Sequence, residues 1–152
     1  MNTTSGISRS TAAATVMGLT ACSSMGSLGS AASLFEKLGG SQSVTTMASD
    51  LVSSTVKDPR LAGLTGGKPV DTAASSTQVS NQLCSMLGGG CKAPLSDQQI
   101  ASAGSKVTPD QSKAVSDNLT STLEKVASDP QVRELVTKAV GSKLPGVLSA
   151  LL

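Results

Sequence analysis

Three cysteines, Cys22, Cys84 and Cys91, are the residues of this chain with the most assignable chemistry, because its 152 residues include no histidine. Without histidine there is no Ser-His-Asp or Cys-His nucleophile and no ordinary proton carrier near neutral pH. A structural zinc site takes four thiolate or imidazole ligands, which three separated cysteines do not supply. We therefore expect no enzymatic activity, no catalytic residue and no metal site.

Cys22 ends the short sequence LTAC, which closes an N-terminal region of secretory character. Arg9 is the only charge before a weakly apolar run, TAAATVMGLTA, that is too short to span a bilayer. LTAC resembles the bacterial lipobox, in which the cysteine is acylated and becomes the mature N-terminus. The alternative is an Ala/Ser/Thr-rich leader that contains an incidental cysteine.

The lipobox resemblance implies a signal peptide over residues 1–21 and lipid attachment at Cys22. Several acyl chains on one residue anchor a protein stably in a membrane. Ser23 stands where an aspartate would, by the usual sorting rule, retain the protein in the inner membrane. The resemblance therefore implies the periplasmic face of the outer membrane. Residues 22–33, rich in Gly and Ser, would form a flexible, disordered tether to a domain over residues 34–152.

Cys84 and Cys91 lie on either side of a run of three glycines at residues 88–90. In an oxidising periplasm, two cysteines at this distance across a glycine turn are candidates for a disulfide. Closing so short a loop stabilises a fold by roughly 2.5 kcal/mol in the chain-entropy account. Two free thiols are the alternative.

The composition indicates a single domain that does not bind nucleic acid. The formal charge is only +2, 14% of the residues are charged, and Lys and Arg are scattered singly. Phe35 is the only aromatic residue, so Leu, Val, Met and Ala must form most of the core.

From Leu34 onward, apolar residues recur at helical spacing, and no β-rich run appears. One helix is predicted to end near KDPRL, and a second to run over 72–87 before the glycines. Residues 62–76 form a polar, turn-rich connection of unassigned structure. Thr108 and Asp129, each followed by proline, predict the caps of two more helices, the second of which ends at Gly141. LPGVLSALL closes the chain as an apolar tail.

These elements predict an all-α fold of five or six helices. Each helix has a predicted inner face, made of apolar residues that fall on one side. The residues of these faces are Val44, Met47, Ala48, Leu51, Val52 and Thr55; Val79, Leu83 and Met86; Val115, Leu119, Leu123 and Val126; and Val132, Leu135, Val136, Ala139 and Val140.

Three motifs, in order, resemble the group 1 truncated haemoglobins. LFEKLGGSQSVTTMASDLVSSTVKDPRL is similar to the opening of that family, in which an aromatic residue, an acidic residue and LGG precede an amphipathic helix and a D-P-x-L turn. LCSMLGGGCK is similar to the end of its distal helix, and GSKVTPDQ to the entry of its penultimate helix. The three matches span most of residues 33–140. A generic helical bundle with glycine stops is the alternative.

The resemblance implies a globin fold with a haem site, but the ligand positions are altered. Counting back from the aliphatic-Thr step places the proximal histidine at Ser102, or near Ala101. A haem iron needs such an axial ligand. Met47, Met86 and Cys84 are candidate substitutes, but the spacing of the methionines favours core residues over iron ligands. The distal-pocket positions of the family fall at Leu51, Val52, Gln78, Val79 and Gln82.

We therefore expect a haem-free lipoprotein with a truncated-globin-like domain and no cofactor, which acts as a binding or structural module. Its partner would be another envelope protein or a small apolar ligand in the vacated cavity. The alternative function is a haem-binding truncated haemoglobin that holds oxygen or another diatomic gas through an unusual ligand.

Overall fold

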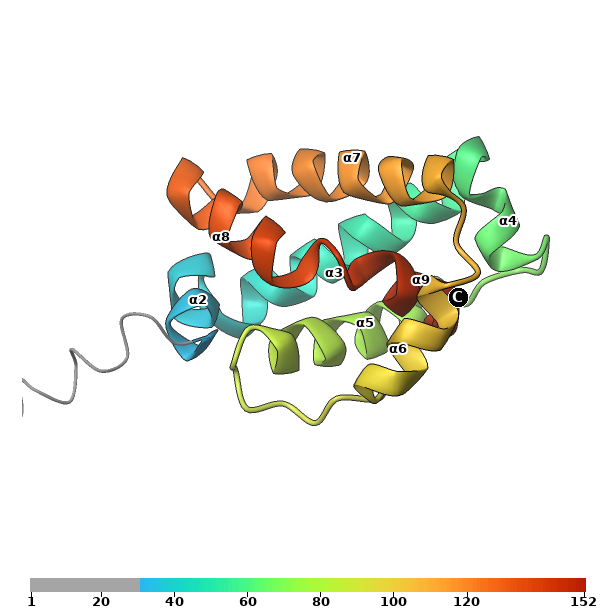
Figure 1. The fold of residues 1–152 in the computed structure, drawn as a ribbon. Coiled ribbons are helices and arrows are strands. Elements are labelled where there is room, and N and C mark those ends of the chain that lie inside the picture. The colour runs from blue at the N-terminus through green and yellow to red at the C-terminus, as the bar shows by residue number, and fades with distance from the viewer. Residues whose placement is uncertain (1–30) are drawn as a thin grey trace, which may run out of the picture.

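The computed structural model describes residues 31–152, and side chains from Leu34 onward. The predicted signal peptide, Cys22 and most of the predicted tether lie outside the described residues. Residues 31–152 form eight α-helices and one short 3-10 helix, and contain no strand (Figure 1). The all-α expectation is confirmed, and the larger number of helices arises from short elements that the sequence pattern did not separate.

The first two described helices meet at a pair of glycines. Helix α2 (Ala31–Leu38) begins three residues before the predicted domain boundary, and α3 (Gly40–Lys57) follows it directly. Gly39 and Gly40 have φ values of 110° and 74°, which side chains rarely permit, so LGG turns the chain between the helices. All residues predicted on the inner face of α3 are buried: Val44, Met47, Ala48, Leu51, Val52 and Thr55.

The connection from α3 to the next long helix contains two short elements. Asp58 caps the 3-10 helix η1 (Pro59–Leu61), and α4 (Ala62–Thr65) follows it. Asp71 caps the next helix, α5 (Thr72–Met86), because its carboxylate accepts hydrogen bonds from the backbone N–H groups of Ala73 and Ala74. The start and end of α5 agree closely with the predicted helix over 72–87.

Helix α6 (Asp97–Gly104) was not predicted. Ser96 and Gln99 form a capping box at its start, the same pattern that was recognised in TPDQ. Thr108 and Asp129 are confirmed as the caps of α7 (Pro109–Val126) and α8 (Pro130–Val140). The apolar tail forms α9 (Leu144–Leu151).

Helix α3 packs against α5 and α7, and α9 runs across the middle of the molecule between α7 and α5 (Figure 1). Helix α8 contacts α2, α5 and α7 through one stripe of residues, Val132, Val136 and Val140, which are buried. The prediction that Leu135 faces inward is wrong, because its side chain lies off this stripe and is 42% exposed. Among the other predicted core residues, Met86, Val126 and Ala139 are only partly buried.

Candidate functional site

The structure separates the predicted proximal position from most of the predicted distal positions. Ser102 is exposed on α6 and lines a surface depression together with Ser149 and Ala150 of α9. Leu51, Val52 and Val79 are fully buried in the main core, on α3 and α5. Gln78 is exposed to solvent.

Helix α9 occupies the space between α6, which carries Ser102, and α5, which carries Val79. It contacts both helices, and its Leu144, Val147 and Leu148 are completely buried. On the α5 side, the hydroxyl of Ser75 donates to the carbonyl of Leu151 at 3.5 Å. Within the described residues, α9 thus fills the region in which the resemblance to globins implies a vacated haem cavity.

The contact between α9 and α6 depends on glycine. A Cβ atom added to Gly146 would come too close to the carbonyl oxygen of Ile100, and one added to Gly104 would lie 3.6 Å from the Cα of Gly146. The backbones of α6 and α9 therefore approach each other at Gly146 more closely than a larger residue there would allow, whereas a Cβ at Gly104 would be at ordinary contact distance. The LPG sequence gives the tail both a proline suited to a helix start and the small residue that this contact requires.

Gln82, at the position that the resemblance assigns to a phenylalanine against the porphyrin, has a structural partner in this chain. Its side chain is 3% exposed, and its Oε1 accepts a hydrogen bond from the backbone N–H of Leu95 at 3.0 Å. A buried amide left without a partner would be costly. This hydrogen bond therefore holds the loop between α5 and α6 against α5.

Cys84 and Cys91 are joined by a disulfide across the end of α5, with their Cα atoms 5.6 Å apart. Gly88 and Gly90 have φ values of 81° and 79° and turn the chain back toward the helix. A Cβ on Gly89 would lie 2.6 Å from the sulfur of Cys84 and 2.6 Å from the ring of Phe35. The only aromatic residue of the chain thus packs on the glycine turn, which explains why LFEKLGG and LGGGCK meet in space.

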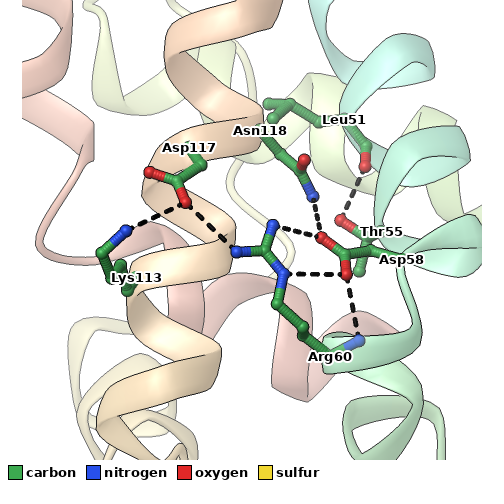
Figure 2. Close-up of polar contacts among 7 residues, drawn as sticks. All are labelled: Leu51, Thr55, Asp58, Arg60, Lys113, Asp117 and Asn118. Atoms are coloured by element: carbon green, nitrogen blue, oxygen red, sulfur yellow. Dashed lines mark hydrogen bonds and ion pairs between the residues drawn. The ribbon is translucent and has the colours of Figure 1, made fainter.

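A cluster of charged side chains joins the turn after α3 to α7 (Figure 2). The Arg60 guanidinium donates to both carboxylate oxygens of Asp58, at 2.8 and 3.1 Å, and to Asp117 of α7 at 3.2 Å. Asn118 donates to Asp58 at 3.4 Å, and Lys113 pairs with Asp117 at 3.4 Å. The side chain of Asp58 is only 11% exposed, whereas Arg60 and Asp117 are about half exposed.

The same contacts lower the pKa values of both carboxyl groups in the cluster. The hydrogen bond from Arg60 holds the pKa of Asp58 below its ordinary value of 3.8, against the opposing effect of desolvation. The pKa of Asp117 is also below 3.8, again chiefly through its hydrogen bond from Arg60 and then through Lys113. These residues bind one another, so we interpret the cluster as a structural contact that holds the turn after α3 against α7.

This cluster predicts an acid-dependent loss of stability. Because the folded-state pKa values of Asp58 and Asp117 are depressed, their contribution is present above the unfolded-state value near 3.8 and is lost as the pH falls through the folded-state values. Urea unfolding at several pH values should show this fall below about pH 5. Arg60→Gln should flatten it, whereas Lys138→Gln, which removes a different exposed pair, should leave the cluster's share intact. Equal slopes for Arg60→Gln and the parent would contradict the assignment.

A groove of about 500 Å³ lies between α6, the start of α7 and the start of α9. Its wall is mainly apolar or small, from Ile100, Ala101, Gly104, Val107 and Pro145. A second depression of about 480 Å³, toward Met86 and Leu95, adjoins it. Asp97 and Lys143 border both, and their side chains form an ion pair at 3.0 Å between the two hollows.

Two further features bear on possible sites. Among the side chains from Leu34 onward, no three His, Cys, Asp or Glu residues gather as a metal-binding group. Within residues 31–152, no helix has the length and apolar character needed to cross a membrane. Comparison with protein-family models, with curated proteins and with solved structures finds no match to the chain.

The sequence carries no signal that pairs Arg60 with Asp117, or Asp97 with Lys143. Their members are 57 and 46 positions apart, and nothing in a single sequence indicates pairs at such separations. Helix α6 could have been found from its S-x-x-Q capping pattern. The groove that it borders could not, because it forms only when α9 packs against α6.

Proposed function

We propose that this chain is a haem-free, truncated-globin-like lipoprotein, anchored through Cys22 to the periplasmic face of the outer membrane, which acts as a non-catalytic binding module. The observation that carries the haem-free part is the position of α9 between the helices of Ser102 and Val79. A haem placed there would have to displace Leu144, Val147 and Leu148. It would also find no histidine in the chain.

The resemblance to truncated globins is supported by where its motifs fall. LFEKLGG lies at the junction of α2 and α3, LCSMLGGGCK at the end of α5, and VTPDQ at the start of α7. These are the element boundaries that the resemblance assigns to them. Phe35 of the first motif packs closely on Gly89 of the second, so the two motifs form one contact in the structure.

The envelope location is supported by the lipobox sequence and by the disulfide. Structural disulfides persist in oxidising compartments such as the bacterial periplasm and are rare in the cytosol. Cys84 and Cys91 are paired, which leaves Cys22 as the one cysteine of the chain outside that pair. Metabolic labelling with palmitate, followed by fractionation of the envelope, tests the anchor; Cys22→Ser should abolish the label.

The haem-free proposal predicts the result of a haemin titration. The purified protein should show no stoichiometric Soret band, because iron would lack an axial ligand and the interior is filled. Ser102→His should be equally silent, because residue 102 is exposed on α6 and lines an open depression on the surface. A truncated haemoglobin that serves as a positive control should give its band under the same conditions.

A sharp one-to-one Soret band in the parent protein would overturn the proposal and favour the haem-binding alternative. Met47→Leu and Cys84→Ala would then identify the ligand. A band that appears only in Ser102→His would show instead that α9 can leave its position. In that case the protein would lack haem only because it has no histidine ligand, and not because its interior is filled.

A further inference from the structure

The groove beside α6 has the composition of a small-molecule site. Ligand pockets in proteins typically measure about 300–1,000 Å³ and combine apolar walls with a few polar groups. This groove, at about 500 Å³, offers Ile100, Val107 and Pro145 on its wall and carries two charged side chains, Asp97 and Lys143, at its border. Two hydroxyls, from Ser112 and Ser142, complete its polar part.

The two charged side chains differ in their freedom to move away. The side chain of Asp97 is 85% exposed, whereas that of Lys143 is 48% exposed. Exposed ion pairs contribute little to stability, so replacing Asp97 by another anion on Lys143 costs little free energy. If the pair opens, the Asp97 carboxylate is already almost fully hydrated, while Lys143 stays at the border of the groove. This asymmetry favours a ligand that brings a negative charge to Lys143.

We propose that this groove binds a single-chain anionic amphiphile of the fatty-acid class. Its alkyl chain lies along Ile100, Ala101 and Val107, and its carboxylate replaces that of Asp97 on Lys143. A longer chain extends past the ion pair into the adjoining depression toward Met86 and Leu95. This inference rests on the proposed binding function and names its ligand class. The groove includes Ala101, the alternative proximal position, and the adjoining depression includes Gln82 of the predicted distal pocket.

The test uses the full 152-residue chain carrying Cys22→Ser, so that no detergent is needed to keep it in solution. Laurate, kept below its micelle concentration, is titrated by calorimetry, and the site is located from backbone amide shifts. We expect one-to-one binding, with the largest shifts at Ile100, Ala101, Gly104 and Val107. Dodecyltrimethylammonium, with the same chain and the opposite charge, should bind at least about tenfold more weakly.

Two substitutions of the ion pair should act in opposite directions. Lys143→Gln should weaken laurate binding about tenfold, because a charge-assisted hydrogen bond is lost. Asp97→Asn should strengthen it about two- to fivefold, because the competitor for Lys143 is removed. Ala101→Phe, at an exposed position of α6, should fill the groove and reduce binding more than tenfold without disturbing the helical circular dichroism. Lys138→Gln removes a lysine from an exposed pair on α8 and serves as the matched control.

Opposite effects of the two ion-pair variants would support the proposal, because a general loss of structure would not strengthen binding. The proposal is overturned if laurate shifts no groove resonance, if it binds as tightly to Ala101→Phe, or if the cationic amphiphile binds equally well. If haemin gives no Soret band and laurate does not bind, the fatty-acid ligand is rejected but the proposal of a haem-free binding module is not. A Soret band would reject the module itself.

Discussion

Leu148→Ala is expected to lower the free energy of unfolding by about 2–5 kcal/mol, the range for removing a fully buried leucine side chain. Leu148 lies on α9, is 0% exposed, and belongs to the same core cluster as residues of α3, α5 and α7. Domains of this size are stable by only about 5–15 kcal/mol, so the variant could lose a large share of its stability. The expected loss follows directly from the placement of the C-terminal tail inside the molecule.

Urea unfolding followed by circular dichroism measures this effect, and Leu135→Ala is its matched control. Leu135 is a leucine on the neighbouring helix α8 but is 42% exposed, so its truncation should cost less than about 1 kcal/mol. The apolar spacing predicted that Leu135 lies in the core, and it did not predict where the apolar tail that forms α9 would pack. If both variants lose the same stability, the position of α9 between α5 and α6 is wrong.

Removing the disulfide through Cys84→Ala with Cys91→Ala is expected to cost about 2.5 kcal/mol. The cross-link restrains the unfolded chain over a sequence separation of 7, and such a short loop gives an effect at the lower end of the usual range. Cys84 is also buried, so its sulfur contributes packing against the turn that holds Phe35. Denaturation of the double variant against the parent, both without reductant, gives the difference.

A reducing agent should lower the stability of the parent by a similar amount and leave the double variant unchanged. Cys22→Ser, which keeps the pair, should respond to reductant as the parent does. A parent that shows the same denaturation midpoint with and without reductant would contradict a structural role for this bond. Gly89→Ala offers an independent probe, since its new Cβ would press on both Cys84 and Phe35.

Local signals in the sequence predicted the boundaries of several helices correctly. Thr108 and Asp129 cap their helices because each side-chain oxygen accepts a hydrogen bond from a backbone N–H two or three positions later. The glycines at 39, 40, 88 and 90 end or start helices because they adopt positive φ. Such rules involve residues within one turn of each other, so a single sequence contains the whole interaction.

Inner faces were predicted well where a helix is surrounded and poorly where it lies outside. Every predicted residue of α3 is buried, because α3 packs against several neighbours. On α8 the apolar spacing also included Leu135, but only one stripe meets other helices. Periodicity shows which residues share a face of a helix. It does not show how much of that face the neighbouring helices will cover.

The candidate site divides in the same way. The sequence by itself determined that the chain has no histidine for iron, that two cysteines flank a glycine turn, and that the fold is helical. Only the tertiary structure decided that α9 lies between α5 and α6, and that Lys143 meets Asp97 beside a groove. The physical reason is range: caps and turns depend on neighbouring residues, whereas the position of a helix depends on apolar surfaces and glycine contacts brought together from distant parts of the chain.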